Sequence, residues 1–278
     1  MIIAQISDLH AHVEGDYAYG RVNTLPMIQR AIAHLNQLNP RPDLVVATGD
    51  LTHHGKQAEY EVLKSLLAEL NMPLYLLLGN HDQRRSLQQV LGDYIPVDRS
   101  TADSPIQYVV ENYPVRLIML DTVVAGEDGG CLDEARLNWL EEQMAIAPTK
   151  PTFLFVHHPP FATGIPTMDC IGLAGSDRLA KLIARYPAIQ RIAAGHLHRP
   201  IFCNWAGTVA STAPSLVHQV ALEMRPDVPG EFVMEPPAYH LHIWRALEQT
   251  WVSHITYVDS YLGPYKFSDY RATETRND

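Results

Sequence analysis

The sequence predicts an α/β fold, and three observations support this prediction. Short apolar segments that are typical of strands alternate with segments of helical spacing. Residues 44–47 and 152–156 are almost entirely apolar, as in strands of a sheet that is covered on both faces. Residues 107–111 and 115–120 have the pattern of a hairpin, which adds antiparallel pairing. We therefore expect mixed β-structure flanked by helices, either as one sheet or split into two.

The expected elements follow in a regular order. Strands are expected at 2–6, 44–47, 73–78, 107–111, 115–120, 152–156, 189–194, 202–210 and 215–221. Helices are expected at 24–38, 59–70, 133–144 and 178–185. Residues 226–237 are rich in proline, glycine and acidic residues, which indicates a loop. The alternating segments 239–244 and 251–257 then predict two edge strands.

The length of 278 residues suits one large domain with a small appendage. We expect a catalytic domain at 1–225 and a C-terminal β-hairpin extension with a tail at 226–278. Aromatic side chains, which are enriched in interface cores, recur in this extension and predict a homo-oligomer. They are Trp244, Trp251, Tyr257, Tyr261 and Tyr265.

Composition and charge argue against several kinds of partner. The formal net charge of −10 disfavours binding to a nucleic acid polymer or to an anionic membrane. No segment approaches the roughly 20 apolar residues that span a bilayer. The chain runs from Met1 directly into an expected strand without the features of a signal peptide, so a cytoplasmic location is expected.

Potential metal ligands follow five of the expected strands. They are Asp8 with His10, Asp50, Asn80 with His81 and Asp82, His157 with His158, and His196 with His198. In open α/β sheets the carboxyl ends of strands line one crevice, so these side chains are expected to converge. Each pair alone is weak evidence, because a lone His-x-His is usually a polar strand face and a lone Gly-Asp is usually a turn. Five such motifs, each at a strand end, predict a metal centre.

The donor atoms indicate the class of metal. Imidazole nitrogens, carboxylates and an amide oxygen together suit divalent Fe, Mn, Zn or Co. The set has no thiolates, and it is richer in nitrogen than a typical magnesium site. Residues two apart in an extended chain point the same way, so each Asp-x-His or His-x-His pair can bind the same metal cluster. Glycines before Asp50, Asn80 and His196 allow sharp turns and close backbone approach.

In this order, the motifs resemble those of the calcineurin-like metallophosphoesterases over residues 1–220. The segments Leu-Tyr-Leu-Leu-Leu-Gly-Asn-His-Asp, His-His-Pro-Pro and Ser-Leu-Val-His-Gln are similar to segments of the bacterial glycerophosphodiester phosphodiesterases, a branch that lies beside the cyclic-nucleotide phosphodiesterases. The resemblance implies a two-sheet sandwich flanked by helices, with a small C-terminal β extension. It also implies two divalent metal ions and hydrolysis of small phosphodiesters by a hydroxide that bridges them.

The resemblance also implies a role for each matching residue. The first metal would be held by Asp8, His10, Asp50 and His198. The second metal would be held by Asp50, Asn80, His157 and His196, so that Asp50 bridges the pair. His81 would lie beside the phosphate, where it would donate a proton to the leaving oxygen or stabilise charge. Asp50 and His81 are therefore the expected catalytic residues.

Further side chains are expected near the substrate. His218 resembles a substrate-contacting histidine of these phosphodiesterases, and a role on a strand face is the alternative. His53 and Tyr19 would border the pocket unless they are exposed loop residues. Asp82 is interpreted as a turn cap, with orientation of His81 as the alternative. Three histidines of the C-terminal strands are not expected to bind metal: His240, His242 and His254.

Three other functions remain open at the level of sequence. A phosphomonoesterase or a protein phosphatase of the same superfamily would use the same ligands, and a non-catalytic metal-binding scaffold is possible in principle. The ligand loops are poor in arginine, which disfavours a protein phosphatase. No ligand of the motif set is substituted, which favours an enzyme over a scaffold. A phosphodiesterase acting on cyclic nucleotides or glycerophosphodiesters is therefore the predicted function.

Overall fold

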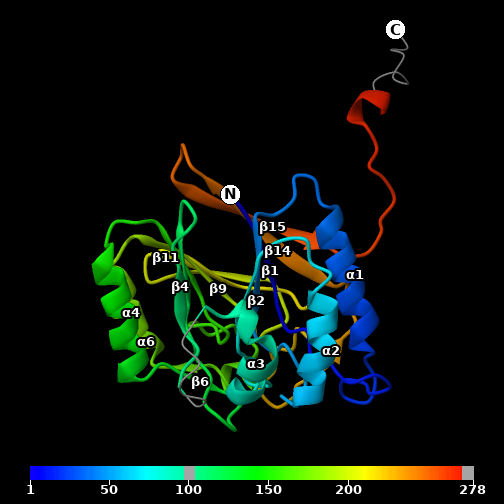
Figure 1. Ribbon diagram of the computed structural model, residues 1–278, viewed down its shortest axis with the longest axis horizontal. Coiled ribbons are helices and arrows are strands. Elements are labelled where there is room, and N and C mark those ends of the chain that lie inside the picture. The colour runs from blue at the N-terminus through cyan, green and yellow to red at the C-terminus, as the bar shows by residue number, and fades with distance from the viewer. Residues whose placement is uncertain (97–103, 271–278) are drawn as a thin grey trace.

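Two β-sheets form the centre of the molecule, and helices cover the outer face of each sheet (Figure 1). The computed structural model describes residues 1–96 and 104–270 of the chain. The arrangement confirms the expected α/β sandwich of two mixed sheets flanked by helices. Within those described ranges, no helix combines the length and the apolar character that crossing a membrane requires.

The first sheet has the strand order β15-β14-β1-β2-β3. Its strands are β1 (Ile2–Ile6), β2 (Leu44–Thr48), β3 (Leu74–Leu77), β14 (Ala238–Arg245) and β15 (Thr250–Tyr257). Strands β1, β2 and β3 run parallel, whereas β14 pairs antiparallel with both β1 and β15. The helices on this side are α1 (Thr24–Gln37), α2 (Gln57–Leu67) and α3 (Arg84–Leu91).

The second sheet has the strand order β10-β11-β9-β7-β5-β4. Its strands are β4 (Tyr108–Val110), β5 (Arg116–Met119), β7 (Thr152–Phe155), β9 (Ile189–Ala194), β10 (Ile201–Trp205) and β11 (Thr208–Thr212). Its main helices are α4 (Glu134–Ile146) and α6 (Ser176–Arg185). Shorter elements are η1 (Gly92–Tyr94), β6 (Gly130–Cys131), α5 (Pro166–Asp169), β8 (Leu173–Ala174), β12 (Gln219–Val220), β13 (Phe232–Val233) and η2 (Phe267–Tyr270).

The apolar strands are explained by burial on both faces. Along β7 and the residue after it, Phe153 and Phe155 belong to the core shared with the first sheet, whereas Leu154 and Val156 pack with α4 and α6. This alternation follows from the two-residue period of a strand. Each fully buried side chain of this kind contributes about 1.5–3 kcal/mol of transfer free energy.

A polar network of buried side chains links the two sheets next to this core. The Gln5 amide nitrogen donates to the backbone oxygen of Ala194 (2.9 Å) and to the hydroxyl of Thr48 (3.0 Å). His242 Nε2 donates to the Gln5 side-chain oxygen (3.0 Å), and the Ser253 hydroxyl contacts the other ring nitrogen (2.7 Å). His242 therefore has a structural role between the sheets.

Several expected elements are wrong in detail. Residues 202–210 form a hairpin rather than one strand, because Ala206 and Gly207 have positive φ (50° and 83°) and make the tight turn between β10 and β11. Most of 215–221 is irregular, with only β12 at its end. Strand β14 is an interior strand, so only β15 is an edge. Helix α3 was not expected, because its sequence is mainly polar.

Candidate metal centre

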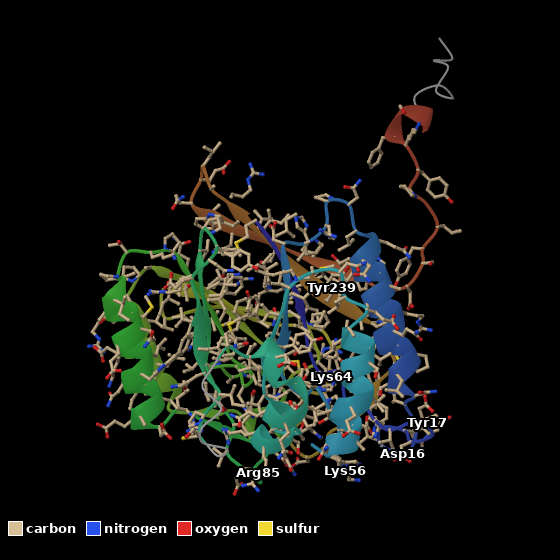
Figure 2. All side chains as sticks on the ribbon, in the orientation of Figure 1. Asp16, Tyr17, Lys56, Lys64, Arg85 and Tyr239 are labelled. Carbon is tan, nitrogen blue, oxygen red and sulfur yellow. The ribbon has the colours of Figure 1, made fainter. Side chains whose placement is uncertain are left out.

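The predicted ligands come together at the carboxyl ends of five parallel strands. Asp8 follows β1, Asp50 follows β2, Asn80 follows β3, and His157 follows β7. His196 and His198 follow β9. Backbone hydrogen bonds hold neighbouring loops together, from the Asp8 nitrogen to the Gly49 oxygen (3.1 Å) and from the Gly195 nitrogen to the His157 oxygen (3.0 Å). In Figure 2, labelled residues from the segments that follow β1, β2 and β3 (Asp16, Tyr17, Lys56 and Arg85) lie at the same end of the molecule.

The first group of ligands consists of buried residues whose donor atoms lie within 4.8 Å of one another: Asp8, His10, Asp50 and His198. The Nε2 atoms of His10 and His198 face each other at 3.2 Å, and His198 Nε2 lies 3.5 Å from Asp8 Oδ1. Asp8 Oδ2 is buried and has no hydrogen-bond partner. A buried carboxylate oxygen without a partner is costly, and a bound cation would satisfy it. These residues therefore fit a divalent metal ion.

The second group lies on the other side of Asp50. The Asn80 side-chain oxygen is 3.1 Å from His157 Nε2 and 3.0 Å from His196 Nδ1. His157 Nε2 is also 3.5 Å from Asp50 Oδ1, whereas Asp50 Oδ2 is 3.7 Å from His10 Nε2. The two oxygens of Asp50 thus face different groups, which is the geometry of a bridging carboxylate.

Backbone carbonyl groups fix the tautomers of three of these histidines. The ring nitrogens that donate are His157 Nδ1 to the Thr48 oxygen (2.7 Å), His198 Nδ1 to the His218 oxygen (2.9 Å) and His196 Nε2 to the Ile171 oxygen (3.1 Å). A carbonyl oxygen only accepts, so each of these ring nitrogens carries the hydrogen. The other nitrogen of each ring then presents a lone pair to the centre, which is the arrangement that metal coordination requires.

Burial keeps three of the ligand histidines in the metal-binding protonation state. Burial, reinforced by the neighbouring histidines, lowers the pKa of His10 and His196 well below the usual value. Burial also lowers the pKa of His198 to about 4. Neutral imidazole is the form that binds a metal, so no proton has to be displaced from these rings at neutral pH. The pKa of Asp8 is raised, first by burial and then by repulsion from Asp50.

A left-handed backbone conformation orients most of the ligand side chains. Five of the seven predicted ligands have φ between 45° and 67°: Asp8, His10, Asp50, His196 and His198. Left-handed backbone at non-glycine residues costs about 1–3 kcal/mol each and is concentrated at functional sites. The paired ligands therefore converge through left-handed turns, and the extended conformation expected from their spacing is wrong.

Two motif glycines are required by close packing around Asp50. A Cβ atom at Gly49 would lie 2.7 Å from the Gly79 nitrogen and would overlap the His157 ring. A Cβ atom at Gly79 would overlap the Asp50 carboxylate. Any larger residue at either position would displace a ligand.

The Asp82 carboxylate ties two ligand loops together. It accepts hydrogen bonds from the backbone nitrogens of Leu51 (3.0 Å) and Gly79 (2.9 Å), and from the Tyr60 hydroxyl (2.8 Å). These contacts agree with the turn-cap interpretation. His81 is held by other groups, since its Nδ1 contacts the His53 backbone oxygen (2.7 Å) and its backbone nitrogen donates to Asp50 Oδ1 (2.9 Å).

Four of the seven predicted metal ligands line a cavity of about 510 Å³: Asp50, Asn80, His196 and His198. Three of the four expected substrate residues line it as well: His81, His218 and Tyr19. The fourth, His53, contacts the Tyr19 ring (4.8 Å between centroids) and the His10 ring (5.3 Å) from behind this wall. Tyr19 also stacks on Phe232 at 5.2 Å. A larger cavity of about 920 Å³ lies elsewhere, against Arg191 and Trp251, and no predicted ligand lines it.

Sequence reasoning missed part of the cavity wall. Phe232 and Glu231 come from the segment 226–237 that was interpreted as a loop, and Asp128 comes from a loop without a motif. Pairing of β12 with β13 brings Phe232 over the site. No local pattern in the sequence marks this pairing, because each of the two strands is only two residues long.

Comparison with known proteins agrees with this geometry. The chain matches the family model for calcineurin-like phosphoesterases over residues 1–200. It is 40% identical over 268 residues to the probable glycerophosphodiester phosphodiesterase of Arcobacter nitrofigilis, with 96% of this chain and 97% of that protein covered. It is 36% identical over 239 residues to a probable cyclic nucleotide phosphodiesterase of Rhodopseudomonas palustris, with coverage of 84% and 85%.

Solved structures show a similar fold. A dimetal phosphatase from Danio rerio aligns with a TM-score of 0.61 at 17% identity and covers 92% of this chain and 99% of that chain. At this identity the similarity concerns the fold alone. The family match and the sequence relatives together establish that this chain belongs to the calcineurin-like phosphoesterase family.

Proposed function

We propose that the protein hydrolyses small phosphodiesters, namely glycerophosphodiesters or cyclic nucleotides, with two divalent metal ions as cofactors. The donor set suits Fe, Mn, Zn or Co, with Asp50 as the bridging ligand between the two groups. When bound, two such ions lower the pKa of a water molecule and stabilise negative charge on the phosphoryl oxygens. The two sequence relatives, a probable glycerophosphodiester phosphodiesterase and a probable cyclic nucleotide phosphodiesterase, support a diester as the substrate.

The charge of the cavity is the observation that carries this proposal. The described residues that line it include no lysine and no arginine, and they include the acidic Asp128 and Glu231. Two arginines that follow ligand segments are already paired, Arg84 with Asp121 (2.9 Å) and Arg199 with Glu235 (2.7 Å). A phosphomonoester carries about −1.5 to −2 charges at neutral pH, whereas a diester carries a single charge. The cavity is therefore better matched to a diester.

The apolar part of the wall matches the organic groups of such a diester. It is formed by Met168, Ile171, Val220 and Phe232. We assign substrate contacts to Tyr19 and His218 at the edge of the same cavity, and we assign to His53 the support of Tyr19. In this arrangement the metal ions would bind the phosphate, and the cavity wall would contact the two ester substituents.

We assign to His81 the transfer of a proton to the leaving oxygen. Its Nδ1 contacts the His53 carbonyl oxygen and therefore carries a hydrogen, so Nε2 is the atom available to the substrate. Burial opposes protonation of this ring, but the Asp50 carboxylate, the His53 carbonyl oxygen and the carboxylates of Asp82 and Asp128 together outweigh burial and raise the pKa of His81. A protonated Nε2 can then donate to a departing alkoxide.

We also propose that the extension at 226–278 mediates assembly of a homo-oligomer with the catalytic domain at 1–225. Three of the five aromatic residues on which the oligomer was predicted are exposed, namely Tyr257, Tyr261 and Tyr265. Trp244 is buried and packs at 5.2 Å against Trp251, which is only partly exposed. After β15 the chain leads away from the body of the molecule (Figure 1), which leaves these tyrosines accessible to a second copy. Residues 271–278 lie outside the described ranges.

Protein loaded with Mn²⁺ is expected to hydrolyse bis(p-nitrophenyl) phosphate with a higher kcat/KM than p-nitrophenyl phosphate, because the cavity lacks cationic side chains. Asp50→Ala should lower the diester kcat/KM by more than about 100-fold. Loss of a residue that only hydrogen-bonds to a metal ligand typically costs about 10–100-fold, and Asp50 is a proposed ligand itself. The matched variant Asp259→Ala at an exposed position should retain full activity. A preference for the monoester, or an active Asp50→Ala protein, would contradict the proposal.

His81→Ala is expected to impair substrates according to their leaving group. For an alkyl diester such as glycerophosphocholine, kcat should fall by about 10²–10⁴-fold, because an alkoxide needs a proton as it departs. For bis(p-nitrophenyl) phosphate, whose leaving group is stable as an anion, the loss should be much smaller. Metal content should stay at the wild-type level. An equal loss of kcat with both substrates would show that His81 is not the proton donor.

Light scattering coupled to gel filtration is expected to give a mass that is a multiple of the 31.2 kDa chain. The triple variant Tyr257→Ser, Tyr261→Ser and Tyr265→Ser should shift this mass toward the monomer, since it removes three exposed aromatic side chains. Tyr17→Ser, a matched change at another exposed tyrosine, should leave the mass unchanged. A wild-type protein that elutes only as a monomer would refute the oligomer.

A further inference from the structure

A third set of ligand-type side chains lies outside the two groups around Asp50. It consists of His12 from the loop after β1, His54 from the loop after β2 and Glu59 from the first turn of α2. Their donor atoms all lie within 4.8 Å of one another. His12 and Glu59 are each only 2% exposed, whereas His54 is at the surface. The set therefore has an inner part that is fixed by packing and an outer part that is free to adjust.

Only one oxygen of the Glu59 carboxylate accepts hydrogen bonds from the backbone at the start of α2. Its Oε2 accepts the backbone N–H groups of His54 and Lys56, both at 3.0 Å. Lys56, labelled in Figure 2, marks the start of α2. The other oxygen, Oε1, faces His12 Nδ1 at 3.8 Å, which is too long for a hydrogen bond. One carboxylate oxygen thus remains for a ligand beside the His12 ring.

The His12 ring has no partner of its own. Both of its nitrogens are buried, and neither makes a hydrogen bond within the described part of the chain. Buried polar groups are nearly always satisfied, so an unpartnered imidazole beside a carboxylate oxygen calls for a bound group. Imidazole nitrogens and carboxylate oxygens are the donor atoms that bind zinc in many proteins.

The distances and donor types suit one divalent ion. Zinc binds histidine nitrogen and carboxylate oxygen at about 2.0–2.2 Å, so two tetrahedral ligands of one ion lie about 3.4 Å apart. The 3.8 Å between His12 Nδ1 and Glu59 Oε1 is close to that separation. Two histidines and one carboxylate leave the fourth position for water, as in many three-ligand zinc sites.

We propose that His12, His54 and Glu59 bind a third divalent metal ion of the zinc class, separate from the pair held by Asp50. The ion connects the loop after β1 to the loop after β2 and to the start of α2. His53 lies between the two centres, since its ring is 4.5 Å from His12 and 5.3 Å from His10 between centroids. Its Nδ1 also contacts His10 Nδ1 at 3.2 Å. The third ion therefore fixes the wall behind a ligand of the catalytic pair.

Metal content tests this site without any measurement of activity. Full-length protein is stripped with a chelator, dialysed against Zn²⁺ and assayed for zinc per chain by mass spectrometry. His54→Ala and Glu59→Gln should each bind one zinc fewer than the wild type. Glu59→Gln keeps an oxygen that can accept from the His54 and Lys56 nitrogens, and His54 is exposed, so both variants are expected to fold. The matched variant His254→Ala, at an exposed histidine of β15, should bind as much zinc as the wild type.

The same assay in an Asp50→Ala background separates this site from the catalytic pair. Adding His54→Ala to Asp50→Ala should remove one further zinc. If wild type, His54→Ala and Glu59→Gln all bind the same amount of zinc, the third site is refuted. A loss of zinc in Asp50→Ala would in that case still report the catalytic pair, so failure of the third site would be distinguishable from failure of the proposed function.

Discussion

The Asp50 carboxylate connects ligands from the two sheets at one buried point. Its Oδ2 faces His10 from the loop after β1, and its Oδ1 faces His157 from the end of β7. The surrounding structure is built to allow this double contact. Gly49 and Gly79 leave space for the carboxylate and for the His157 ring, and Asp82 holds the two flanking loops in register. The packing of the sheets thus sets the distance between the two groups of metal ligands.

Burial of like charges explains why the site calls for cations. Asp8, Asp50 and Asp82 are all buried within one small region, and repulsion from Asp50 contributes to the raised pKa of both Asp8 and Asp82. Burial holds the ligands His10, His196 and His198 neutral, so they supply lone pairs but little positive charge. Divalent ions would satisfy the orphaned Asp8 oxygen and neutralise this cluster. The strained left-handed backbone at the ligands fits the same account, because such strain persists where function requires it.

The fold class and the convergence of the ligands could be predicted from the sequence, because both depend on local sequence patterns. Apolar segments that end in Gly-Asp, Gly-Asn-His or Gly-His mark strand ends, and parallel strands bring those ends together. The conformation of the ligand loops was not predictable from spacing, since Asp8 and His10 reach the centre through left-handed turns. Phe232 and Asp128 were missed because short-range patterns carry no trace of the pairing that places them over the cavity.

The contacts of His12 and Glu59 illustrate the same limit. The two residues are far apart in sequence, and they meet only because the loop after β1 packs against the start of α2. Their relation to a metal therefore becomes visible only in three dimensions. His240 and His242 were not expected to bind metal, and the structure places His242 in the hydrogen-bond network between the sheets.

A crystal structure of the Mn²⁺-loaded protein, with anomalous scattering used to locate the metal, tests the bridging role of Asp50 most directly. The account predicts two anomalous peaks about 3.5–4 Å apart, one on each side of the Asp50 carboxylate. One ion should contact His10 and His198, and the other should contact Asn80, His157 and His196. A single peak, or a pair of peaks that Asp50 does not bridge, would contradict the account.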